Sequence, residues 1–197
     1  MKMSSFEKRF VNSVRHSRRV ADRAEERLHA ANPQPGEHLL DVGCGNGAAA
    51  IQLAQSLQLT VTGVDIDPEQ IKTATAAAQN IPSAHFLSAD ATRLPFDDGQ
   101  FDLVYTNKTT HHIRDWQQAF AEMARVLKPG GRLICSDFVA PVGNRLPTRR
   151  ALERLANQHR LTSTGHSRTP LSYAAIFRKA QSPDQADSDR RGPSSTT

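Results

Sequence analysis

The 197 residues, 38% of them hydrophobic, are enough for one domain with a buried core, and the formal net charge is +5. No apolar run approaches the roughly 18–20 residues that a membrane-spanning helix needs, and the first ten residues carry charge where a secretory signal is apolar. Two cysteines, Cys44 and Cys135, are also too few for a disulfide framework or a cysteine-ligated zinc site, so we exclude secreted, transmembrane and zinc-finger classes and expect a cytoplasmic globular domain.

The two ends of the chain differ in character from its middle. Apolar residues recur at steps near three and four over roughly 4–31, which predicts one or two amphipathic helices that end at the breaker cluster NPQPG. We therefore expect residues 1–34 to form N-terminal capping helices and residues 35–180 to form the main domain. The polar segment 181–197 has no large apolar residue to bury, which predicts a disordered tail.

Between these ends, strand-like and helix-like segments alternate. This alternation is typical of βαβ units with right-handed crossovers and a mainly parallel sheet, so we predict a doubly wound α/β fold with helices on both faces. Lys128–Gly131 is expected to be a turn, and a further turn is expected at Arg168–Pro170. The predicted strands are 38–42, 59–64, 84–87, 101–106, 132–138, 161–165 and 171–178, and the predicted helices are 48–57, 69–79, 116–127 and 148–159.

The glycine loop that follows the first strand is the first candidate site, with the sequence LLDVGCGNG over 39–47. Its glycines allow a sharp turn and let a ligand approach the start of the next helix without a Cβ in the way. Asp41 stands at the strand end, where a carboxylate repels a pyrophosphate but can hold an ammonium group. The loop also lacks the lysine of a phosphate-binding P-loop. A tight turn without any ligand is the alternative.

Two further aspartates follow the next two strands. Asp65 ends the second strand, where a carboxylate can accept hydrogen bonds from both hydroxyls of a ribose. Asp67 precedes Pro68 and fits a helix cap better than a ligand contact. Asp90 follows the third strand, where its carboxylate can accept from the exocyclic amine of adenine; a plain surface turn is the alternative for it.

Four motifs in this order and spacing carry a family resemblance: LDVGCGNG, GVDIDP, SADATRLPFDDGQFDLV and RVLKPGGRLICSDF. Together they resemble the class I S-adenosylmethionine-dependent methyltransferases, in the branch that includes the ubiquinone/menaquinone-type small-molecule enzymes. The resemblance covers roughly 35–140 and extends more loosely to about 180. It implies a Rossmann-like, seven-stranded sheet whose last strand is antiparallel.

The resemblance also implies a binding site for S-adenosyl-L-methionine. In the family pattern the first aspartate and the loop glycines serve the methionine end, Asp65 takes the ribose, Ile66 packs on the adenine, and Asp90 with Ala91 reads the adenine edge. The segment after the fourth strand lines the site of methyl transfer. The implied cofactor-binding residues are Asp41, Gly43, Cys44, Gly45, Gly47, Asp65, Ile66, Asp90, Ala91, Thr106 and Asn107.

Catalytic candidates lie just after the fourth strand: Asn107, His111 and His112. A histidine can act as a general base near neutral pH, although methyl transfer from a sulfonium depends more on proximity and desolvation than on acid–base help. The alternative is that one histidine packs beneath the cofactor and the other is exposed. No third ligand accompanies the pair at metal-site spacing, so we expect no metal.

The leading functional hypothesis is methyl transfer to an O, N or C nucleophile of a small-molecule acceptor, with S-adenosyl-L-homocysteine as the other product. The alternatives are an RNA- or protein-directed methyltransferase and a non-catalytic S-adenosylmethionine-binding protein. Basic residues are concentrated in 1–31 and 141–180, whereas 32–140 is acidic, which favours an acceptor of negative character. We expect a monomer or homodimer. Because the segment 139–148 is short, the acceptor pocket must be roofed by the N-terminal helices or by another subunit.

Overall fold

The computed structural model describes residues 14–138, 149–168 and 172–182. The predicted capping residues 1–13, the connection 139–148, most of the turn at 168–170 and the tail residues 183–197 lie outside this part of the chain. The elements in chain order are α2 (Val14–His29), β1 (His38–Val42), α3 (Ala48–Ser56), β2 (Thr60–Asp65), α4 (Pro68–Ala77), β3 (Ala84–Ser88), β4 (Phe101–Asn107), the 3-10 turn η1 (Thr110–His112), α5 (Trp116–Val126), β5 (Leu127–Phe138), α6 (Arg149–Gln158), β6 (Leu161–Arg168) and β7 (Ser172–Lys179).

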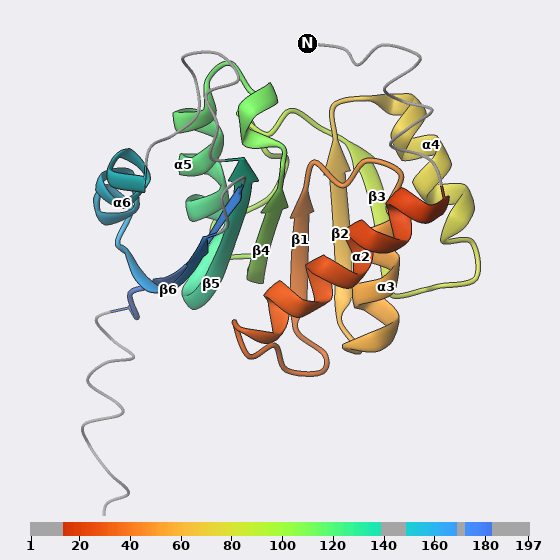
Figure 1. The fold of residues 1–197 in the computed structure, drawn as a ribbon, viewed down its shortest axis with the longest axis horizontal. Coiled ribbons are helices and arrows are strands. Elements are labelled where there is room, and N and C mark those ends of the chain that lie inside the picture. The colour runs from red at the N-terminus through yellow and green to blue at the C-terminus, as the bar shows by residue number, and fades with distance from the viewer. Residues whose placement is uncertain (1–13, 139–148, 169–171, 183–197) are drawn as a thin grey trace, which may run out of the picture.

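The strands form one seven-stranded sheet in the order β3-β2-β1-β4-β5-β7-β6 (Figure 1). Neighbouring strands from β3 to β5 pair in parallel, whereas β7, the last strand of the chain, runs antiparallel to both of its neighbours. The strand order reverses direction between β1 and β4, which is the position where ligands bind in open α/β sheets. The predicted doubly wound fold with an antiparallel last strand is therefore confirmed.

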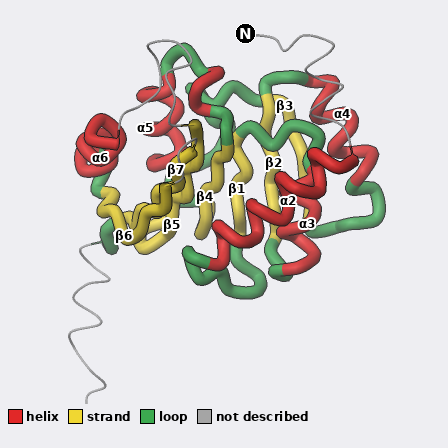
Figure 2. The backbone as a smooth tube through the Cα atoms, viewed as in Figure 1, coloured by secondary structure: helices red, strands yellow, loops and turns green. Residues whose placement is uncertain are grey.

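Consecutive residues of the inner strands enter two different cores, because side chains alternate across a pleated sheet. Leu39 packs in a cluster with α2 and α3, whereas Leu40 packs in a cluster with α5 and α6. Figure 2 shows α2 and α3 lying across β1 and β2 on one face of the sheet. The helix α2 reaches this face through Ala24 and Leu28, both fully buried.

One predicted turn is wrong. The segment 128–131 belongs to the start of β5, in which Leu127 already pairs with Phe101 before the register shifts. Gly130 has φ +76°, so the chain forms an irregularity in an extended strand and does not reverse. Lys128 holds this extended path because its Nζ lies 2.8 Å from Oδ1 of Asp102 on β4. The turn residues Pro and Gly thus mark a bulge here.

Candidate active site

The carboxyl ends of five parallel strands form one edge of the sheet, at the top of Figure 1. Polar residues lie at or just beyond each of these ends. In sheet order they are Asp90 after β3, Asp65 on β2, Asp41 on β1, Asn107 on β4 and Asp137 on β5. The structure therefore brings the sequence-predicted residues together along one edge, and it adds Asp137, which was not among them.

The glycine loop after β1 is fixed to the end of the neighbouring strand. Gly43 N and Cys44 N both donate to the Val64 carbonyl, at 2.8 and 3.0 Å. Gly43 has φ +79°, and a Cβ there would lie 2.2 Å from Oγ1 of Thr109, so no larger residue fits. Gly45 also has a positive φ, +54°, but a Cβ there would meet no atom within 4 Å. The loop is thus open to a ligand at Gly45 and closed at Gly43.

Asp65 connects this loop to β2. Its Oδ2 accepts from Gly45 N at 2.9 Å and its Oδ1 accepts from Asp67 N at 3.0 Å. A carboxylate oxygen can accept more than one hydrogen bond, so both oxygens keep the capacity to accept from a ligand's hydroxyl groups. The next residue, Ile66, is 69% exposed, the only large hydrophobic side chain so exposed in the described part of the chain. An apolar surface therefore lies next to a hydroxyl-binding carboxylate.

Asp41 is a buried carboxylate without a hydrogen-bond donor among the described residues. Its side chain is 3% exposed and receives no hydrogen bond from any residue that the structure describes. Burial, and then the nearby charge of Asp65, raises the pKa of Asp41 to about 7. The ionised form of a carboxyl buried in this way is costly unless a positively charged donor approaches it. The site therefore fits a ligand that brings an ammonium group to the end of β1.

The two remaining predicted aspartates differ in their local roles. Asp67 accepts from Glu69 N at 3.1 Å and caps α4, as its position before Pro68 predicted. Asp90 is exposed, and its Oδ1 accepts from both N and Oγ1 of Thr92, at 2.8 and 2.7 Å. Its Oδ2 has no partner among the described residues. Asp90 thus orders its own turn and keeps one oxygen for a ligand, while the following Ala91 packs against the core.

Beyond β4 the chain turns over the end of the sheet. Thr106 is buried and its Oγ1 has no hydrogen-bond partner in the described residues. Asn107 accepts at Oδ1 from Nη1 of Arg27 on α2, at 2.9 Å. Lys108 has φ +54°, and its Nζ lies 4.7 Å from the centre of the Phe138 ring. These contacts join α2 to the ends of β4 and β5.

The predicted histidines meet a buried carboxylate on β5. Asp137 is fully buried, and Nδ1 of His111 lies 2.8 Å from its Oδ1. The backbone N of His111 and the hydroxyl of Thr110 donate to the other oxygen, Oδ2. Burial acts to raise the pKa of Asp137, but the hydrogen bonds from His111, Thr110 and the Phe138 backbone outweigh it and hold that pKa below its ordinary value. Asp137 is therefore ionised.

An ionised Asp137 sets the state of the His111 ring. Because the carboxylate can only accept, the ring carries a proton on Nδ1, and in the neutral ring Nε2 is then an acceptor. The His112 ring lies tilted against the His111 ring at 3.9 Å between ring centres and Phe138 lies edge-on at 5.3 Å, so two rings pack against the imidazole. The sequence signal for Asp137 was its place at the carboxyl end of β5.

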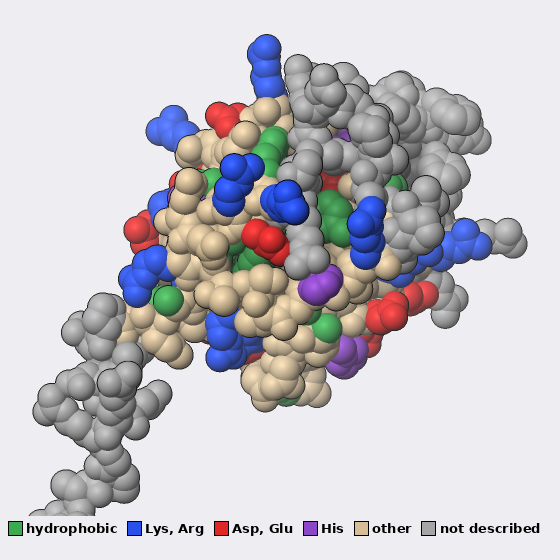
Figure 3. Space-filling model, turned by 60° about the vertical axis from the view of Figure 1, so that its left-hand side comes forward, with side chains coloured by type: hydrophobic (Ala, Val, Ile, Leu, Met, Phe, Trp, Pro, Cys, Tyr) green, Lys and Arg blue, Asp and Glu red, His purple; other side chains and the backbone are tan. Residues whose placement is uncertain are grey.

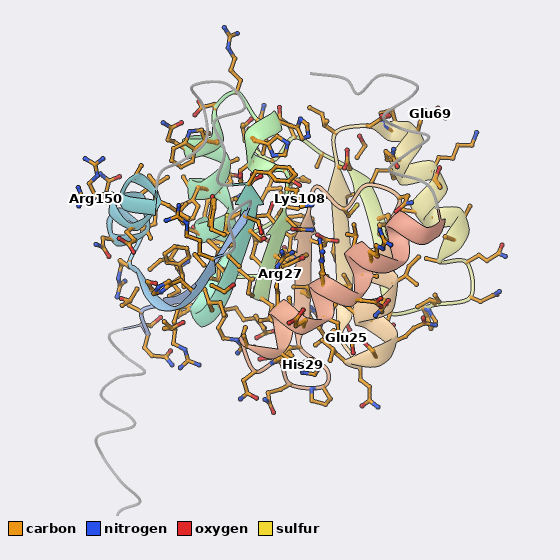
Figure 4. The ribbon with its side chains drawn as sticks, in the orientation of Figure 1. Glu25, Arg27, His29, Glu69, Lys108 and Arg150 are labelled. Atoms are coloured by element: carbon orange, nitrogen blue, oxygen red, sulfur yellow. The ribbon has the colours of Figure 1, made fainter. Side chains whose placement is uncertain are left out.

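A small cavity of about 130 Å³ opens between α2 and the end of β4. Its lining contains four cationic side chains, from α2 and from the residue after β4, together with Asn107 and Val20. Figure 4 shows Arg27 on α2 and Lys108 at the end of β4. Burial, and then the charges of Arg23 and Arg27, lower the pKa of Lys108. The cationic residues of this basic pocket are Arg19, Arg23, Arg27 and Lys108.

Other chemistries find less support. Burial raises the pKa of Cys44, and it raises the pKa of Cys135 to about 12, so neither thiol is a ready nucleophile. In residues 14–138, 149–168 and 172–182, no cluster of three His, Cys, Asp or Glu side chains could hold a metal ion. Over the same residues, no helix combines the length and apolarity needed to cross a lipid bilayer.

Comparison with known proteins agrees with this geometry. The model of a family described as a methyltransferase domain matches residues 40–135, which contain the loop and the strand-end residues except Asp137. An O-methyltransferase of Penicillium expansum is 41% identical over 112 residues, which are 55% of this chain and 41% of that protein. Residues 40–135 of the chain are thus similar in sequence to methyltransferase domains.

Two other similar proteins extend the comparison. The 27-O-demethylrifamycin SV methyltransferase of Amycolatopsis mediterranei is 39% identical over 121 residues, covering 59% of this chain and 44% of that protein. The structure of Haemonchus contortus phosphoethanolamine N-methyltransferase 2, in complex with S-adenosyl-L-methionine, superimposes with a TM-score of 0.74 at 18% identity over 81% of this chain and 53% of that one. The chain spans less than half the length of the two curated relatives.

Proposed function

We propose that this chain transfers a methyl group from S-adenosyl-L-methionine to an O, N or C nucleophile of a small-molecule acceptor. The observation that carries the proposal is the unpartnered buried carboxylate of Asp41, placed beside the open loop position Gly45 and the Asp65 carboxylate. These three features match an ammonium group, a closely approaching ligand and a ribose. The exposed Ile66 provides an apolar side chain against which the flat adenine ring can pack.

Different residues of the chain contact different parts of the cofactor. Asp41 holds the α-ammonium group of the methionine end, and Asp65 accepts from the ribose hydroxyls. Asp90 accepts from the adenine amine through Oδ2, while the backbone at Ala91 meets a ring nitrogen. The remaining predicted contacts are Gly43, Cys44, Gly47, Thr106 and Asn107. When bound, S-adenosyl-L-methionine supplies a methyl group activated by its sulfonium sulfur, and S-adenosyl-L-homocysteine remains after transfer.

The residues after β4 and β5 serve the acceptor. The acceptor's lone pair forms the new bond to the methyl carbon as the carbon–sulfur bond breaks, and its proton must leave when the nucleophile is a hydroxyl or an amine. His111 can take that proton on Nε2, since Asp137 fixes Nδ1 as the protonated nitrogen. Asp137 is then a positioning residue. Tight enclosure by α2 and η1 would supply the proximity and water exclusion that this displacement needs.

A small molecule is the acceptor class that the observations favour. The curated relatives include an O-methyltransferase and an enzyme named for a demethylrifamycin substrate. Figure 3 shows Lys and Arg side chains of the described residues dispersed among acidic and neutral ones on the face that it presents. We accordingly propose a cytoplasmic enzyme, monomeric or homodimeric, that acts on metabolites.

The experiment that tests this function is an acceptor screen that reads out S-adenosyl-L-homocysteine release. Phenols, amines, carboxylates and activated carbon acids are offered with S-adenosyl-L-methionine, and folded RNA is included as the competing substrate. Release that depends on a small acceptor supports the proposal. Release only with RNA favours the nucleic-acid alternative, and cofactor binding without any release identifies a non-catalytic binding protein.

A further inference from the structure

The helix α2 carries arginines on the side that faces the end of β4 and turns two of its acidic residues toward α3. Asp22 and Glu25 face α3, where Nε2 of Gln52 donates to both, at 3.3 and 2.7 Å. Arg19, Arg23 and Arg27 recur every four residues and therefore share the side that faces the end of β4. Glu26, the third described acidic residue of α2, lies on the same side as Arg19 and Arg23 by helical spacing, but among the described residues it forms no ion pair with them.

The arginine side of α2 has no acidic partner in the part of the chain that the structure describes. None of Arg19, Arg23, Arg27 and Lys108 lies within ion-pair distance of a described carboxylate. Arg27 instead donates to the neutral amide oxygen of Asn107. Like charges at a spacing of four along a helix repel one another, and the fourth cation closes the same small cavity. An anion entering the cavity would relieve this repulsion.

We propose that this basic pocket binds an oxyanion group of the methyl acceptor, a carboxylate or a phosphate ester. The inference rests on the function proposed above and names the acceptor's chemical class. Guanidinium groups bind both kinds of oxyanion through paired N–H donors, and Asn107 can add an amide N–H because Arg27 already occupies its oxygen. The cavity of about 130 Å³ holds a charged head group and a few carbons, which excludes a nucleic-acid strand as its occupant.

The pocket is also connected to the reaction edge. Lys108 lies over the Phe138 ring, and that ring contacts His111, which Asp137 holds. Asn107 ends β4 next to β1, the strand that carries Asp41. An acceptor anchored by its oxyanion therefore extends its remaining atoms along the same strand ends that bind the cofactor. The pocket sets both the charge and the orientation of the acceptor.

The test measures binding to the full chain saturated with S-adenosyl-L-homocysteine. The probes are 4-hydroxybenzoate, 4-hydroxyphenyl phosphate and the neutral, isosteric 4-hydroxybenzamide. Their binding is measured by ligand-observed NMR. We expect both anions to bind at least about tenfold more tightly than the amide, because only they pair with the cations. The tighter of the two anions identifies whether the natural group is a carboxylate or a phosphate ester.

Variants locate the binding in the pocket. Arg23→Gln should weaken anion binding about fivefold to tenfold, and Arg19→Gln with Arg23→Gln should weaken it further, because each removes one charge-assisted donor. Arg150→Gln is the matched control, since Arg150 is an exposed helical arginine on α6, far from α2 in Figure 4. It should leave all affinities unchanged.

The outcomes separate this inference from the proposed function. Equal binding of the amide and the anions, no binding of either anion, or an equal response of Arg23→Gln and Arg150→Gln overturns the inference. The proposed function stands in those cases if S-adenosyl-L-homocysteine still binds the wild-type chain and binds the variants within twofold of it. If S-adenosyl-L-homocysteine itself fails to bind the wild-type chain, the proposed function fails first.

Discussion

The edge of the sheet formed by β1, β2 and β3 presents carboxylates, whereas the neighbouring pocket between α2 and β4 presents three arginines and a lysine. The carboxylate edge is held by hydrogen bonds to the backbone. Asp65 accepts from two backbone N–H groups, and the glycine loop that it supports is hydrogen-bonded to β2. The pocket is built from long side chains that reach from a helix surface. Opposite charges at two adjacent sites suit the two ligands proposed above, a cofactor that brings an ammonium group and an acceptor that carries an oxyanion.

This difference in construction has consequences for mutation. Changes on the carboxylate edge alter the loop and the strand ends as well as the ligand contacts, because Asp65 and the glycines hold the backbone itself. Changes in the basic pocket remove exposed or half-buried side chains and leave the sheet intact. The two regions should therefore respond separately when cofactor binding, acceptor binding and stability are each measured.

The largest expected effect is on the carboxylate edge. Gly45→Ala should weaken S-adenosyl-L-homocysteine binding by up to about 100-fold, since overfilling a close contact costs about 1–3 kcal/mol. Folding should lose only about 1 kcal/mol, because the added Cβ meets no protein atom. Gly99→Ala is the control: it has φ +65°, no contact closer than 3.8 Å, and a place at the opposite end of the sheet. Equal binding by both variants would show that no ligand approaches Gly45.

The second-largest effect separates cofactor binding from turnover. Asp137→Asn should reduce kcat about 30-fold with the best acceptor from the screen, because an amide no longer fixes the proton on Nδ1 of His111. Affinity for S-adenosyl-L-homocysteine should stay within twofold. The rate is measured under single-turnover conditions across a pH series, where a shifted profile distinguishes a positioning role from a loss of folding. An unchanged rate would remove His111 from proton transfer.

The third effect concerns Asp41 and pH. Burial and Asp65 place its pKa at about 7, and a bound ammonium group would lower that pKa, so cofactor binding releases a proton near neutrality. Affinity should therefore rise about tenfold from pH 6 to pH 8 as the free carboxyl ionises. Asp41→Asn should bind more weakly and lose this part of the pH dependence, as measured by calorimetry. Parallel curves for the two proteins would contradict the assignment.

The smallest effect is expected at Ile66. Its side chain is 69% exposed, so Ile66→Ala should leave the melting temperature unchanged. Affinity for S-adenosyl-L-homocysteine should fall about threefold, because part of the apolar contact with adenine is lost. The matched ligand is free homocysteine, which lacks the adenine and should bind both proteins equally. A drop in stability without a change in affinity would make Ile66 a structural residue.

Much of the carboxylate edge could be predicted because its residues lie in short contiguous motifs at strand ends. A parallel sheet brings all such ends to one edge, so the positions of Asp41, Asp65 and Asp90 follow once the strands are known. The same reasoning predicted the helix cap at Asp67. The surface turn that the sequence left open as the alternative for Asp90 is formed as well, since N and Oγ1 of Thr92 donate to its Oδ1.

The basic pocket and the His111–Asp137 pair depend on contacts between distant residues. Arg27 and Asn107 are 80 positions apart, and His111 and Asp137 are 26 apart, so neither pair forms a motif. The helical spacing of the arginines was visible, but which side of α2 faces β4 follows only from packing. The expectation that the N-terminal helices roof the acceptor pocket stays a prediction, although α2 does line the basic pocket.

The central claim is that the carboxylate edge binds the adenosyl cofactor, and a calorimetric titration with S-adenosyl-L-homocysteine tests it most directly. Wild type should bind one equivalent. Asp65→Ala should bind about 100-fold more weakly, because two charge-assisted hydrogen bonds to the ribose are lost together with the brace on Gly45. The exposed turn variant Asp97→Ala should match wild type. No heat of binding with wild type, or equal affinity in Asp65→Ala, would contradict the account.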